Sequence, residues 1–228
     1  MIQQVAKHHN KIQFFGYEVA NLILVAQQLL TADGLSYGIN AETAGALFFL
    51  LGSGLIWFFD FQKRPYLLFY GGLALAFGGA CFAMAGYFLT GLSVILASLE
   101  TARGGLNILN KLVDDQFNLQ SNCSLCCYIH QQIAHRLLGW YSQLVDRFAK
   151  VHPKLGRFID ERPFITSTLI KAPLRFEFII KKLLFGDWIG ALVGLSWLFL
   201  GDLALAFNDA KLQDYAQQKD QTMQPIAR

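Results

Sequence analysis

The longest uncharged run in the chain covers residues 65–99, between Arg64 and Glu100. A membrane-spanning helix needs about 20 apolar residues, and this run has thirty-five without one charged side chain. That is too long for a single span and short for two full ones. We therefore predict a helical hairpin, with one span near 66–86 and a shorter or tilted span near 88–102.

Further apolar segments extend this pattern. Residues 43–59 carry no charge, and residues 188–201 lie between Asp187 and Asp202. Charged residues make up only 15% of the chain, against about 25% in a typical soluble domain. The sequence predicts an all-α fold, a polytopic integral membrane helical bundle with about four or five spans near 12–30, 43–60, 66–86, 88–102 and 183–208. Segment 12–30 equally suits a helix lying in the interface, and segment 164–182 is ambiguous, so the count can change by one.

The distribution of basic residues predicts the orientation, because Lys and Arg accumulate on the cytoplasmic side of membranes. Residues 1–12 and 61–65 carry two each, 31–42 carry none, and 104–182 carry eleven against six acidic residues. We expect a bacterial-type inner membrane with the N-terminus and residues 104–182 cytoplasmic. The predicted organisation is a membrane region over 1–103, cytoplasmic or interfacial amphipathic helices over 104–182, a span over 183–208, and an outer polar tail over 209–228.

The middle segment has helical periodicity. Apolar residues recur every three or four positions in 126–151, which predicts an amphipathic helix; they are Cys126, Ile129, Ile133, Leu137, Trp140, Leu144, Phe148 and Val151. Residues 163–182 alternate basic and bulky apolar side chains, typical of an element lying on anionic lipid. A small helical subdomain packed on the bundle is the alternative. The net charge of +3 is too small to indicate a nucleic-acid partner.

A stripe of small residues marks the first half of the hairpin. Its members recur in steps of three and four: Gly72, Ala76, Gly79, Ala83 and Gly86. In lipid such stripes let helix backbones approach closely. The stripe is either an interface with a homo- or hetero-oligomeric membrane partner or a packing surface within the chain.

Ionisable residues inside apolar segments are candidate functional groups, because burying them in lipid is costly. Glu18, Asn21 and Asp202 could line a polar path for a cation or a proton, unless Asp202 merely caps a shorter element. Glu100 and Arg103 are three residues apart and close enough to form an ion pair. That pair could equally lie at headgroup level and end the span.

Residues 122–135 concentrate three cysteines and two histidines. On a helix Cys123, Cys127 and His130 share a face, with Cys126 beside them, and thiolates and imidazole are ligands of zinc and copper(I). A single helix cannot surround a tetrahedral ion, so a further ligand would have to come from elsewhere. Packing of small apolar thiols and lipidation are the alternatives. A metal is therefore a possible cofactor, and no other cofactor is indicated.

Three functional classes follow. The first is a non-enzymatic structural or assembly component of a membrane complex, with the lipid bilayer and oligomeric membrane proteins as partners. The second is a transporter or channel for a small solute, an ion or a proton, using Glu18, Asn21 and Asp202. The third is a metal- or thiol-dependent membrane enzyme using Cys123, Cys126, Cys127 and His130. The chain lacks Walker A, GxSxG and HExxH motifs, and nothing indicates a substrate.

Overall fold

The computed structural model describes residues 14–31, 40–58, 66–119 and 125–202, together with the single positions Ile12, Arg64, Ala206 and Asp209. Helices account for these ranges, and no strand occurs within them. The predicted all-α class is confirmed.

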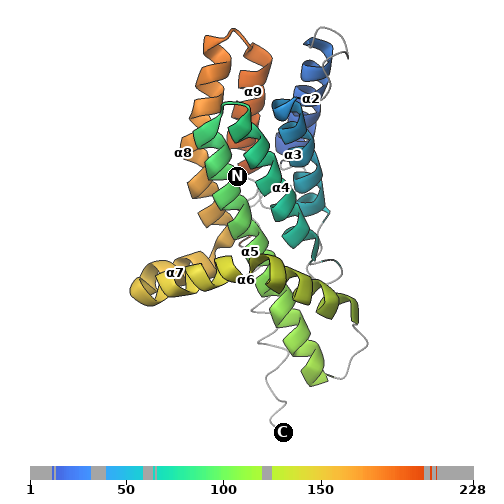
Figure 1. Cartoon of the computed structure of the whole chain (residues 1–228), viewed down its shortest axis with the longest axis vertical. Helices are drawn as coiled ribbons and strands as arrows, with labels where there is room; N and C mark the ends of the chain where they lie inside the picture. Colours follow the sequence, from blue (N-terminus) through green and yellow to red (C-terminus); the bar gives the residue numbers. More distant parts are fainter. Residues whose placement is uncertain are drawn as a thin grey trace.

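Helices from both ends of the chain form an elongated bundle, and two others cross its lower end (Figure 1). The bundle contains the π-helix η1 (Phe14–Val19), α2 (Ala20–Thr31), α3 (Ala41–Trp57), α4 (Tyr66–Met84), α5 (Phe88–Leu119), α8 (Pro163–Leu184), α9 (Trp188–Ser196) and the π-helix η3 (Trp197–Asp202). The crossing helices are α6 (Leu125–Val151) and α7 (Pro153–Glu161).

Glycines bring α4 into close contact with α5. A Cβ atom on Gly91 would lie 2.5 Å from the carbonyl oxygen of Gly79, and one on Gly72 would lie 2.7 Å from the backbone nitrogen of Ala102. Ala83 contacts Gly91 in the same way. The small-residue stripe thus packs within the chain along α5, and it ends at Gly86, whose φ of 94° makes the turn between the two helices.

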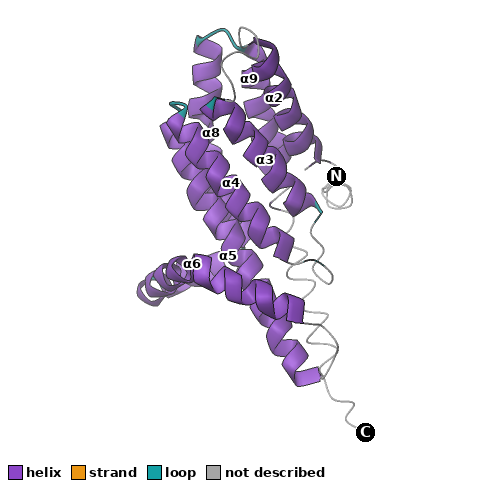
Figure 2. Ribbon diagram, turned by 45° about the vertical axis from the view of Figure 1, so that its right-hand side comes forward, coloured by secondary structure: helices purple, strands orange, loops and turns teal. Residues whose placement is uncertain are grey.

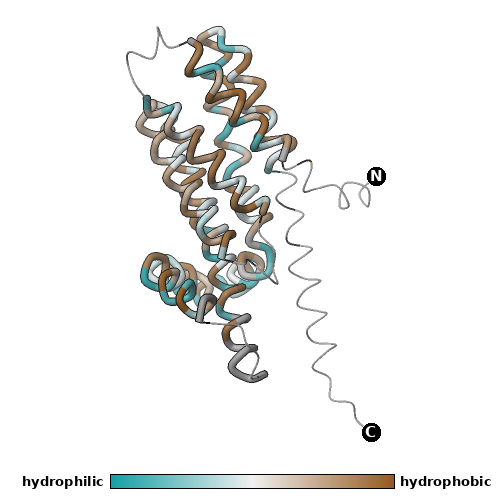
Figure 3. The backbone as a smooth tube through the Cα atoms, turned by 90° about the vertical axis from the view of Figure 1, so that its right-hand side faces the viewer, coloured by the Kyte–Doolittle hydropathy of each residue, from teal (hydrophilic) through white to brown (hydrophobic). Residues whose placement is uncertain are grey.

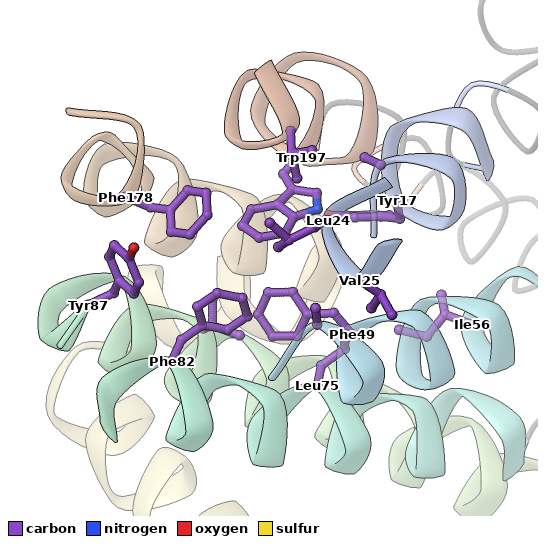
Figure 4. Close-up of a cluster of buried hydrophobic side chains, with 14 of the residues drawn as sticks. Tyr17, Leu24, Val25, Phe49, Ile56, Leu75, Phe82, Tyr87, Phe178 and Trp197 are labelled. Carbon is purple, nitrogen blue, oxygen red and sulfur yellow. The ribbon is translucent and has the colours of Figure 1, made fainter. Parts of the chain in front are cut away.

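Aromatic side chains fill the centre of the bundle. Phe49, Phe82, Phe178 and Trp197 come from α3, α4, α8 and η3 and meet in one group (Figure 4). The ring centroids of Phe49 and Phe82 are 4.9 Å apart, and those of Phe178 and Trp197 are 5.0 Å apart. Such tilted ring contacts add to the energy of burying the rings, so this group holds together helices from both ends of the sequence.

The outside of the bundle is apolar. Exposed large hydrophobic side chains occur on each of its α-helices, including Leu30, Leu51, Phe77, Phe88, Phe176 and Trp188; Figure 3 shows hydrophobic stretches running along these helices. One described helix, α4, is by itself long and apolar enough to cross a membrane, and half of its apolar window is buried in the chain. Helix α3 and the segment Trp188–Asp202 are apolar but shorter.

Helix α5 is longer than the sequence indicated. The second half of the hairpin was expected to stop near residue 102, ahead of Gly104 and Gly105, yet α5 continues to Leu119. A Cβ atom on Gly105 would lie 2.7 Å from the backbone nitrogen of Phe69. The glycine therefore serves the close approach of α4 rather than a helix end, and the helix runs through the expected boundary at 103.

Helix α8 is part of the bundle. Residues 163–182 were expected to lie on the lipid surface or to belong to a small subdomain packed on the bundle, with 164–182 ambiguous as a span; α8 runs along the bundle beside α5 and α9 (Figure 1). Three of its basic side chains, Lys171, Arg175 and Lys182, are buried, and each meets a carboxylate from another helix. The fourth, Lys181, is partly exposed. The Asp209 carboxylate accepts hydrogen bonds from the N–H groups of Phe164 and Ile165. The chain has thus returned, by Asp209, to the end where α8 begins; residues 210–228 of the predicted tail lie outside the described residues.

Helix α6 runs across the bundle and packs one narrow face on it (Figure 2). Ala134 and Leu138 are fully buried in a cluster with Leu106 and Phe69 of α5 and α4. The apolar residues that the periodicity picked out are mostly exposed instead. We call this exposed set the α6 stripe: Ile129, Ile133, Leu137, Trp140, Leu144, Phe148 and Val151.

Candidate functional site: a buried charge cluster between two π-helical segments

The two π-helical segments η1 and η3 cross at glycines. A Cβ atom on Gly16 would lie 2.3 Å from the backbone nitrogen of Gly201, and one on Gly201 would lie 2.6 Å from the ring of Tyr17. Single π-helical turns are uncommon and are often found at functional sites. This crossing brings Tyr17 of η1 next to Asp202, the last residue of η3.

Asp202 is the centre of a group of four polar side chains, which we call the Asp202 cluster. Tyr17 donates its hydroxyl proton to Oδ1 of Asp202. Lys171 Nζ lies 3.1 Å from Oδ1, and Arg175 Nε lies 2.6 Å from Oδ2. Lys171 also donates to the Tyr17 hydroxyl oxygen at 3.3 Å. All four side chains are buried, with Asp202 fully inaccessible.

The charges of the Asp202 cluster depend on one another. Lys171 and Arg175 are four residues apart and so lie on one face of α8, where one carboxylate serves both. The guanidinium carbon of Arg175 lies 5.1 Å from the centre of the Trp197 ring, close enough for a cation–π contact. Removing one partner of a buried ion pair leaves an uncompensated charge and is strongly destabilising. The cluster therefore ties η1, α8 and η3 together.

Glu18, Asn21 and Asp202, which were predicted to line a polar path, do not all meet in one cluster of side chains. The Asn21 side-chain oxygen accepts a 2.9 Å hydrogen bond from Trp197 Nε1, which links Asn21 through the indole to Arg175 and Asp202. Glu18 points elsewhere, with its carboxylate against Gly54 of α3. Among the described residues, Oε1 of Glu18 and Nδ2 of Asn21 have no hydrogen-bond partner.

A second group of charges lies at the far end of α8, and we call it the Lys182 cluster. Lys182 Nζ is 2.5 Å from Glu42 and 2.8 Å from Asp187. Asp187 also accepts bonds from Gln27 and from the N–H of Gly190, at the start of α9. Burial would raise the pKa of Asp187, but the bonds from Lys182, Gln27 and Gly190 outweigh it, so the pKa lies below its ordinary value. The cluster joins α2, α3, α8 and α9.

Glu100 and Arg103 form an ion pair of 2.6 Å inside α5, with both side chains buried. The helix continues past them, so they do not mark its end. Tyr141 of α6 donates its hydroxyl to Glu100 at 3.3 Å. Burial raises the pKa of the Tyr141 phenol, and the nearby carboxylate raises it further. This pair fastens α6 to α5.

The cysteine and histidine group is only partly described. Cys123 lies outside the described residues, as does the side chain of Cys126, whereas Cys127 is buried. His130 contacts α4, with its Nδ1 2.9 Å from the Tyr70 hydroxyl and its ring stacked on Tyr66. Burial lowers the pKa of His130. Within the described residues no three His, Cys, Asp or Glu side chains could hold a metal ion together, so a site using Cys123 stays a prediction from sequence.

Sequence reasoning identified Asp202 but missed its partners. Tyr17, Lys171 and Arg175 were not singled out, because basic residues beside apolar ones indicate a surface helix as readily as a buried one. The available signal was the spacing of Lys171 and Arg175, one helical turn apart in an apolar segment, together with an acidic residue that needed a partner. The chain matches no family model, no curated protein and no solved structure.

Proposed function

We propose that the chain is a multi-span integral membrane protein with a structural role, a rigid bundle that serves as an assembly component of a membrane complex. One observation carries the proposal: the bundle is apolar outside, while buried Lys171, Arg175, Lys182 and Asp202 form ion pairs across helices. Soluble monomers rarely expose apolar patches larger than a few hundred Å². Lipid is the surrounding in which such an outer surface is stable.

The directions of the helices support an even number of membrane crossings. The η1–α2 unit, α3, α4, α5, α8 and the α9–η3 unit alternate in direction along the bundle (Figure 1). Counting α8 as a crossing places residue 209 on the same side as the N-terminus. The sequence after Asp209 contains the basic residues Lys211, Lys219 and Arg228, a residue type that accumulates on the cytoplasmic side of membranes. This supports cytoplasmic placement of both chain ends.

The pairing of charges supports a structural role over a transport role. A polar path requires groups that can exchange partners with a solute, whereas Asp202 and Glu42 are occupied by direct contacts with cationic side chains. The Lys182–Glu42 ion pair and the Tyr17–Asp202 hydrogen bond join helices more than one hundred residues apart in sequence. They hold α8 to α3 and η1 to η3, while the bond from Tyr141 to Glu100 fastens α6 to α5.

The test has two readouts. Purification in a mild detergent should yield the protein together with further subunits in fixed ratio, and carbonate washing should leave it in the membrane. Reconstituted vesicles should show no conductance or solute flux above that of empty vesicles. A stable monomer without partners, or release by carbonate, would overturn the proposal.

Transport is the second candidate, and the unpartnered atoms of Glu18 and Asn21 favour it. A buried carboxylate without a full set of bonds is suited to take up and release a proton. Glu18→Gln should abolish a proton flux in vesicles, while Glu161→Gln, at an exposed position of α7, should leave it unchanged. Equal flux in both variants would remove this candidate.

A further inference from the structure

The α6 stripe faces the bundle side of the arm formed by α6 and α7. Gln131 and His135 both contact Asn110, which lies beyond the bundle on the distal part of α5. At about 100° per residue, the middle of the stripe lies roughly opposite those two residues on the helix. His130, at the edge of the stripe, contacts Tyr66 and Tyr70 of α4. The stripe therefore points towards the apolar belt of the bundle, and the polar side points away from it.

Basic residues border the stripe. Arg136, Arg147 and Lys150 are exposed and lie on the side of α6 opposite the buried Ala134. Asp146 is the acidic residue of α6, and α7 adds the exposed Lys154 close by. The stripe itself is strongly exposed, with Trp140 60% and Leu144 58% accessible. An apolar face bordered by Lys and Arg is the pattern of a helix that lies in the surface of an anionic bilayer.

We propose that the α6–α7 arm binds anionic lipid headgroups, with Leu137, Trp140, Leu144 and Phe148 inserted below them and Arg136, Arg147 and Lys150 contacting their phosphates. This inference rests on the proposed membrane location and names the partner of the arm. The bilayer that surrounds the bundle lies on the side to which the stripe points. The positive charge of the arm complements the headgroups, and the polar face with Gln131 and His135 stays in water.

The test uses the full chain reconstituted in vesicles of phosphatidylcholine alone or mixed with phosphatidylglycerol. Tail-brominated phosphatidylcholine quenches tryptophans that lie among the acyl chains. The difference between the native chain and Trp140→Phe isolates the signal of Trp140. We expect strong quenching of Trp140 in the anionic vesicles and less quenching in neutral vesicles or at high salt, which screens the charges.

Matched variants separate charge from packing. Replacing Arg136, Arg147 and Lys150 together by Gln should weaken the arm's binding equilibrium about fivefold per residue, the equivalent of about 1 kcal/mol each. Exchanging Arg and Lys at the same three positions keeps the charge and should keep the quenching.

Two outcomes would overturn the inference. One is a Trp140 that stays unquenched in anionic vesicles, as a protein partner on the stripe would require. The other is quenching that is the same in the charged and the uncharged variants. Failure of the membrane location itself looks different, because the chain would then not float with vesicles of either composition.

Discussion

Replacing Asp202 by Asn tests whether the Asp202 cluster stabilises the bundle. Asn has nearly the volume of Asp, so the packing stays the same while the negative charge is lost. Lys171 at 3.1 Å and Arg175 at 2.6 Å would then be buried cations without a counter-charge. Breaking a buried ion pair in this way costs about 3–5 kcal/mol. Weakening of the bond from Tyr17, which now donates to a charged acceptor, adds to that cost.

The assay is the free energy of unfolding in mixed micelles, followed by circular dichroism during titration with a denaturing detergent. Asp187→Asn is the matched control, because it makes the same change at a partly exposed carboxylate, leaves Lys182 paired with Glu42 and keeps the cap of α9. We expect a loss of no more than about 1 kcal/mol there. Adding Lys171→Met to Asp202→Asn should recover part of the stability, because one stranded cation is removed. If Asp202→Asn cost no more than Asp187→Asn, the reasoning would be refuted.

Two further predictions concern the helix contacts and the arm. Gly91→Ala should destabilise the bundle by about 1–3 kcal/mol, because the added Cβ would lie 2.6 Å from the backbone nitrogen of Ala83. Gly139→Ala, which has open space around it, should instead stabilise α6 by about 0.5–1 kcal/mol. Thermal unfolding measures both changes, and equal effects would contradict the packing assignment. His130 has a pKa below its ordinary 6.5 because it is partly buried, so the folded arm prefers its neutral form. The contribution of neutral His130 to the stability of the folded arm is complete above pH 6.5 and is lost as the pH falls below that value. The protection factors of the α6 amides, which are corrected for the intrinsic pH dependence of exchange, should therefore fall between neutral and mildly acidic pH. His130→Phe should remove this fall, and an unchanged profile in the variant would show that another group is responsible.

The sequence predicted where helices form, but it did not predict which helices contact one another. The hairpin over residues 66–102 and the amphipathic helix over 126–151 follow from local hydrophobicity, because both depend on the composition of one segment. The role of Gly105 could not be read in this way. A glycine pair after a charged residue looks like a helix end, and only the nearby backbone of Phe69 shows that it permits a close contact.

The candidate site was predicted only in part, because its contacts also join segments that are distant in sequence. Asp202 and Asn21 were noticed as polar residues in apolar segments, and both belong to the group around Trp197. Lys171 and Arg175 were assigned to a surface because their carboxylate partner is about thirty residues away in sequence. The direction of a side chain such as Glu18, towards α3 rather than towards Asp202, depends on how helices are rotated, which hydrophobicity alone does not encode.

The tight turn at Gly86, and a second one like it at Gly186, make the two ends of the bundle differ in accessibility in the described part of the chain. Residues 85–87 and 185–187 connect their helices in three residues each, and Gly86 and Gly186 take positive φ angles there. In the described part of the chain, that end offers almost no loop to an antibody, a protease or a binding protein. The opposite end carries α6, α7 and the distal part of α5. Proteases added to sealed vesicles should therefore cut these turns slowly and the arm readily, so that cleavage reports which face of the membrane was open to attack.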